Sequence, residues 1–117
     1  MLLIVLSAPL LVPAPAATQN NVLAQASRLD NSGQRDAAIA LYRQVLARNA
    51  RSYDAHYGIA RALDLKGNYD EAREHFTQAI ALAQDDGSRD QALRMMGVSW
   101  TFSGDGLRAI SHAASRS

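Results

Sequence analysis

The stretch GQRDAAIALYRQVL at residues 33–46 returns as GNYDEAREHFTQAI at residues 67–80. A glycine, an alanine, an aromatic ring and a small aliphatic residue recur in register, 34 residues apart. A fixed period of this length is typical of helical repeat arrays, because one helix pair cannot bury its apolar face alone and must stack on a neighbour. The sequence therefore predicts a stack of helix pairs.

The rest of the chain after residue 17 continues this helical pattern. It contains no proline and is rich in Ala, Leu, Arg and Gln, which favour helix. Connections of two to five residues require neighbouring helices to run antiparallel. Ser52 and Ser88 are predicted to cap the helices that follow them. Six helices are predicted, at about 19–32, 35–49, 52–66, 69–84, 88–102 and 105–115.

Residues 1–17 have the pattern of a processing segment. The stretch from Leu2 to Val12 is apolar apart from Ser7, and Ala14-Pro15-Ala16 supplies small residues for cleavage. The run is shorter than the about 20 residues that a membrane-spanning helix needs. We expect a signal peptide and a periplasmic or secreted location. An uncleaved hydrophobic N-terminal segment would instead be the chain's only contact with a membrane.

Composition excludes several classes of function. The 12 Lys and Arg balance 11 Asp and Glu, and no basic block stands out, which argues against a nucleic-acid partner. The absence of cysteine excludes disulfide frameworks, thiolate zinc sites and cysteine nucleophiles.

Motifs for catalysis or cofactor binding are also lacking. There is no nucleophile turn, no phosphate-binding glycine loop and no paired-histidine zinc motif. His56 is predicted to be partly buried and bonded to backbone or water, whereas His75 and His112 are expected to face outward. The acidic linker at 85–90 lacks the ligand pattern of a calcium loop. We therefore expect no metal site, no cofactor and no enzymatic activity.

The 34-residue pattern resembles the tetratricopeptide repeat family. The second unit matches best, through Ala60, Leu63, Gly67, Tyr69, Ala72, Phe76 and Ala79. The first unit matches through Ala26, Leu29, Gly33, Ala38, Tyr42 and Val45, with Arg35 where an aromatic residue is commoner. A looser third unit carries Gly97, Trp100, Gly104 and Ala109, while Gly106 and Ala113 replace two aromatics.

The resemblance implies an all-α, right-handed superhelical solenoid of antiparallel helix pairs over residues 18–117. Its units are expected at about 19–52, 53–86 and 90–117, with the last one incomplete. The small residues Ala60 and Ala72 would allow the helices of a unit to approach closely, and Tyr42 and Phe76 would fill the space between units. The third unit begins three residues late, which predicts an insertion in the linker at 85–89.

The unit ends depart from the family pattern. Ala50 and Gln84 stand where a proline is usual, and no polar capping helix follows the last unit. An uncapped unit leaves an apolar face exposed. Three explanations follow: a truncated product of a longer array, which we favour, self-association through the open C-terminal end, or a frayed C-terminus.

In this family the first helices of successive units line a concave groove for a peptide or a partner helix. Tyr57 would offer a flat apolar contact there, and Arg61 and Arg94 would bind carboxylates or carbonyls. The predicted groove residues are Asn20, Leu23, Ser27, Tyr57, Arg61, Asp64, Gln91, Arg94 and Val98.

The resemblance thus implies a non-catalytic protein-interaction scaffold or assembly factor that acts after export. The alternative is a recruiting or regulatory segment of a larger enzyme or multi-domain protein. A reading frame that continues into a catalytic domain would favour this alternative.

Overall fold

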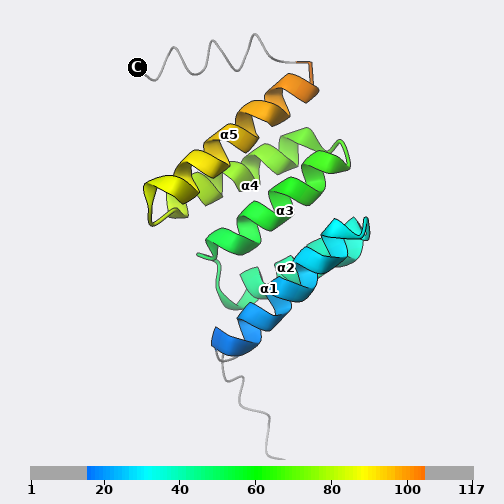
Figure 1. Ribbon diagram of the computed structural model, residues 1–117, viewed down its shortest axis with the longest axis vertical. Helices are drawn as coiled ribbons and strands as arrows, with labels where there is room; N and C mark the ends of the chain where they lie inside the picture. The colour runs from blue at the N-terminus through cyan, green and yellow to red at the C-terminus, as the bar shows by residue number, and fades with distance from the viewer. Residues whose placement is uncertain (1–15, 105–117) are drawn as a thin grey trace, which may run out of the picture.

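The computed structural model describes residues 16–104, and it contains only helices and turns over that range (Figure 1). The all-α prediction is therefore confirmed for this part of the chain. The five helices are α1 (Ala16–Asn31), α2 (Arg35–Arg48), α3 (Tyr53–Leu65), α4 (Tyr69–Leu82) and α5 (Asp86–Phe102).

The helices form a two-layered stack. Each helix packs on the next one in the chain, and α3 also contacts α1 and α5. The layer of α1, α3 and α5 therefore lies against a second layer that contains α2 and α4. Figure 1 shows the stack running from α1 at the bottom to α5 at the top. This arrangement confirms the predicted helical solenoid.

A glycine turn joins the two helices of each of the first two units. Gly33 and Gly67 have φ values of +85° and +86°, a region that only glycine enters without strain. The same hydrogen bond closes both turns: Gln34 N donates to Leu29 O at 2.8 Å, and Asn68 N donates to Leu63 O at 2.9 Å. The internal repeat thus extends to the backbone bonding of the turn.

The core confirms the predicted division between small and large residues. Four alanines at matching repeat positions are fully buried, namely Ala26, Ala38, Ala60 and Ala72. Phe76 is also fully buried, and Tyr42 is 6% exposed. Ala81 lies on the same helix as Ala72 but is exposed. The buried face of α4 is therefore the face that carries the repeated alanine.

The two predicted helix caps have different outcomes. Ser52 caps α3 as expected, because its Oγ accepts a hydrogen bond from Ala55 N at 3.2 Å. The prediction for Ser88 is wrong, since Asp85 caps α5 instead. Its Oδ1 accepts from Ser88 N at 2.7 Å, and Ser88 Oγ donates to its Oδ2 at 3.0 Å. A carboxylate with two acceptor oxygens is favoured at the positive end of the helix dipole, and these bonds lower the pKa of Asp85.

The inserted residues before the third unit are helical rather than part of a linker. α5 has 17 residues against 13 in α3, and it begins at Asp86. The connection from α4 is thereby reduced to residues 83–85. The insertion thus lengthens α5 at its N-terminal end.

Two predicted segments fall largely or wholly outside the described residues. The expected helix at 105–115 lies entirely beyond them, and of the N-terminal segment only residues 16 and 17 are described. α1 begins at Ala16, inside that segment. Among the described helices, none combines the length and the apolar character needed to cross a bilayer.

Candidate functional site

All nine predicted groove residues lie on the layer formed by α1, α3 and α5. Asn20, Leu23 and Ser27 are on α1; Tyr57, Arg61 and Asp64 are on α3; Gln91, Arg94 and Val98 are on α5. The structure distributes eight of them between two neighbouring hollows.

The first hollow has a volume of about 400 Å³, and we call it the tyrosine groove. It brings together six predicted residues, namely Asn20, Leu23, Ser27, Tyr57, Arg61 and Gln91. Its other lining residues are Ala24, Tyr42, Tyr53, Asp54 and Gly58. Side chains from α1, α2, α3 and α5 therefore meet on one surface.

Two tyrosines of this groove are held rigidly. The rings of Tyr53 and Tyr57 stack at 5.7 Å with 9° between their planes. Tyr57 also meets Phe76 edge-on at 6.1 Å, and the Tyr53 hydroxyl donates to the carbonyl of Ser88 at 2.8 Å. A ring fixed before binding loses little conformational freedom when a ligand arrives, so this pair is a preorganised contact surface.

Two tyrosines that line the groove, Tyr42 and Tyr53, have raised pKa values. Burial and the charge of Asp30 raise the pKa of Tyr42, whereas the charge of Arg61 acts in the opposite direction. Burial and the neighbouring Tyr57 raise the pKa of Tyr53. The charged side chains that line the groove are then Asp54 and Arg61.

The second hollow lies between the C-terminal parts of α3 and α5, and we call it the apolar pocket. Its volume is about 380 Å³, and its lining residues are Arg61, Asp64, Leu65, Tyr69, Met95, Val98 and Phe102. Arg61 lines both hollows and therefore marks the point where they meet. Arg94 is exposed and lines neither of them.

The sequence prediction missed several lining residues. Tyr53 lies one helical turn before Tyr57 in the predicted helix 52–66, so this spacing could have identified it. Leu65 and Phe102 could not be found in this way, since their part in the pocket depends on how α5 packs against α3.

Arg73 joins α4 to α5. Its guanidinium carbon lies 3.8 Å from the centre of the Trp100 ring, a cation–π contact. The same group donates to Asp70 at 2.7 Å and to Ser103 Oγ at 3.2 Å. Arg73 is buried, and these contacts position the last described helix.

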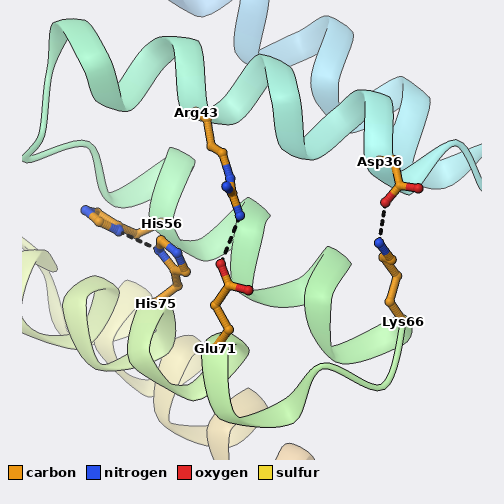
Figure 2. Close-up of polar contacts among 6 residues, drawn as sticks. All are labelled: Asp36, Arg43, His56, Lys66, Glu71 and His75. Atoms are coloured by element: carbon orange, nitrogen blue, oxygen red, sulfur yellow. Dashed lines mark hydrogen bonds and ion pairs between the residues drawn. The ribbon is translucent and has the colours of Figure 1, made fainter.

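The histidines differ from expectation at one position. His56 is buried and its Nε2 lies 3.0 Å from the carbonyl of Ala50, which confirms the predicted bond to backbone. His75 was expected to face outward but is half-buried. Its ring faces His56, and the two Nδ1 atoms lie 3.0 Å apart (Figure 2). Burial and the neighbouring His56 lower the pKa of His75. His112 lies outside the described residues.

This histidine pair has a defined donor pattern when both rings are neutral. A carbonyl only accepts, so Nε2–H of His56 donates to Ala50 and leaves Nδ1 of His56 as an acceptor. Nδ1–H of His75 then donates to it. Over residues 16–104 no group of three or more metal-ligating side chains gathers at this or any other place.

Two ion pairs on the surface join the first unit to the second (Figure 2). Arg43 of α2 contacts Glu71 of α4 at 2.9 Å, and Lys66 contacts Asp36. Exposed pairs of this kind contribute only about 0–1 kcal/mol each. The joint between the units is therefore stabilised chiefly by its buried packing.

Comparison with known proteins agrees with this architecture. The family model of the tetratricopeptide repeat matches residues 23–88, which is more than half of the chain. No curated protein matches the chain. The family match covers the two units whose turns and buried alanines repeat in the structure, so this chain belongs to the tetratricopeptide repeat family.

Proposed function

We propose that this chain is a non-catalytic scaffold or assembly factor that holds a peptide or a helix of a protein partner in the tyrosine groove. Tetratricopeptide repeats generally mediate protein–protein interactions and typically carry no catalytic activity.

The observation that carries the proposal is the stacked pair of Tyr53 and Tyr57 beside Arg61. Tyrosine and arginine are enriched among the residues that dominate binding energy at protein interfaces. The two rings are already fixed, and Arg61 can donate to carboxylates or backbone carbonyls of a bound segment. The groove therefore combines a flat apolar surface with a directional polar contact.

Reversing the charge of Arg61 should strongly weaken partner capture. We expect Arg61→Glu to reduce the recovery of a partner from cell-envelope extract at least about tenfold, because a lost charged hydrogen bond weakens binding by about 1.5–3 kcal/mol. Arg94→Glu is the matched control, since it makes the same charge change on the same layer but outside both hollows.

A photo-crosslinking side chain locates the contact. Placed at Gln91, which lines the groove, it should label the captured partner, whereas at the exposed Gln78 of α4 it should not. Equal capture by the two arginine variants, or equal labelling from the two positions, would remove the groove from the proposal.

We also propose that the protein acts after export, in the periplasm or outside the cell. The support is the apolar run at 2–12 followed by the small residues Ala14 and Ala16. The chain recovered from the envelope fraction should then have an intact mass that lacks about the first 17 residues. A full-length mass from the cytoplasmic fraction would contradict export.

A further inference from the structure

Asp64 is a buried carboxylate without a charge partner. It is 9% exposed, it lines the apolar pocket, and its Oδ1 is fully buried with no hydrogen-bond donor. Among residues 16–104, no basic nitrogen lies within 4.0 Å of it. A buried charge that lacks a partner is unfavourable, so this carboxylate is available to a cationic ligand.

The preceding repeat indicates which cation suits this position. Asp30 stands 34 residues before Asp64 and is likewise buried, at 4% exposure. Its Oδ1 forms an ion pair with Arg35 Nε at 3.7 Å. The residue that matches Arg35 in the second unit is Tyr69, which has no charge. The first unit therefore supplies its own guanidinium to this aspartate, whereas the second unit does not.

The walls of the pocket suit the hydrocarbon part of an arginine side chain. Leu65 is 57% exposed, Phe102 is 72% exposed and Val98 is 39% exposed, and all three line the pocket around Asp64. Long basic side chains pack their methylene stems on apolar surface while the charged end meets a polar partner. The combination of exposed apolar walls and one buried carboxylate thus matches both parts of arginine.

Arg61 does not neutralise this carboxylate. It lies one turn earlier on α3, beyond the distance of an ion pair with Asp64, and its charge influences the pKa of Tyr42 in the tyrosine groove. The surface therefore presents a cation at the junction of the two hollows and an anion inside the apolar pocket.

We propose that the apolar pocket binds an arginine side chain of the protein partner, with the Asp64 carboxylate as the acceptor for its guanidinium. The inference rests on the proposed function, because the pocket continues the tyrosine groove beyond Arg61. It adds a charge rule to that function: the partner segment carries arginine where it reaches the end of α3.

Two peptides that differ in one group test this rule. The probes are acetyl-Ala-Leu-Arg-Leu-Ala-amide and the same peptide with citrulline, which has the shape of arginine but no charge. Titrations of the full chain, followed by amide chemical shifts, should show shifts at Asp64, Leu65 and Val98. We expect the arginine peptide to bind at least about tenfold more tightly than the citrulline peptide.

Asp64→Asn should remove this preference, whereas Asp90→Asn should keep it. Asp90 is exposed on α5, so its variant matches the change in net charge without touching the pocket. The Asp64 variant should unfold at the same or a higher temperature than the wild type, because it loses an uncompensated buried charge. A loss of the preference could then not be attributed to unfolding.

Three results would overturn the proposal. The first is equal affinity for both peptides, or no shift at these amides at up to about 10 mM, where even a millimolar contact is largely saturated. The second is a preference that survives in Asp64→Asn. The third is binding that emerges only after Arg108→Gln and Arg116→Gln, which would assign the pocket to the chain's own C-terminal segment.

The proposed function is tested separately by the same spectra. Shifts at Tyr53 and Tyr57 with both peptides, at equal affinity, would support the tyrosine groove while overturning the arginine rule. If the protein prefers the arginine peptide at Asp64 but Arg61→Glu leaves partner capture unchanged, the arginine rule is supported and the tyrosine groove is overturned.

Discussion

Replacing Phe76 with alanine is expected to lower the free energy of unfolding by about 3–5 kcal/mol, the largest effect of any single truncation in this core. Phe76 is the largest fully buried side chain of the described residues. It belongs to the buried cluster that α1, α2, α3 and α4 share, and its ring meets Tyr57 at 6.1 Å. Since domains of this size are stable by about 5–15 kcal/mol, the variant should be close to unfolding at physiological temperature.

Denaturant unfolding followed by far-ultraviolet circular dichroism measures this effect. Phe102→Ala is the matched control, because Phe102 is 72% exposed and its truncation should change the unfolding free energy by less than about 0.5 kcal/mol. Comparable losses in the two variants would mean that the helix stack is not packed around Phe76. Any Phe76→Ala protein that remains folded should also bind the partner more weakly, because the ring of Tyr57 loses its edge-on contact with Phe76.

The repeat predicted the parts of the fold that depend on local sequence. Gly67 predicted a turn because positive φ excludes other residues, and Ala72 predicted a close helix contact because a larger residue would not fit. Both predictions depend on residue types that have few alternative uses at their positions. The family match and the helix order follow from the same constraints.

The cap of α5 was mispredicted because two residues competed for one role. Asp85 and Ser88 are both good caps, and the sequence alone does not say which one begins the helix. The carboxylate of Asp85 satisfies both the backbone and the side chain of Ser88, so the earlier start is favoured. Local propensity cannot rank such alternatives without the bonds that each one makes.

The site was less predictable than the fold because its residues meet through tertiary packing. The family resemblance placed Arg61 and Arg94 on the same layer, yet of the two only Arg61 lines either hollow. His56 and His75 are 19 residues apart, and their contact depends on the rotation of α3 against α4. The unpaired charge of Asp64 is visible in the sequence only by comparison with Asp30 and Arg35 in the unit before it.

The joint between the first two units depends on a close approach that the repeat did not identify. Gly58 of α3 faces the ring of Tyr42 of α2, and a Cβ atom at Gly58 would lie 2.3 Å from Tyr42 Cζ. That separation is far inside van der Waals contact, and Tyr42 is buried, so its ring cannot move aside freely. The absence of a side chain at Gly58 allows the two units to dock.

Gly58→Ala is therefore expected to destabilise the protein by about 3 kcal/mol through overpacking, although alanine favours helix over glycine by about 1 kcal/mol. In a Tyr42→Ala background the ring is gone, and the same substitution should instead stabilise by up to about 1 kcal/mol. Denaturant unfolding of the wild type, both single variants and the double variant gives the coupling between the two sites. Additive effects in this cycle would mean that Tyr42 does not pack on Gly58. If Gly58→Ala destabilises the wild type but stabilises the Tyr42→Ala variant, the joint between the units depends on the missing side chain at Gly58 and not on the exposed ion pairs of Figure 2. The same joint holds Tyr42, which forms part of the wall of the tyrosine groove.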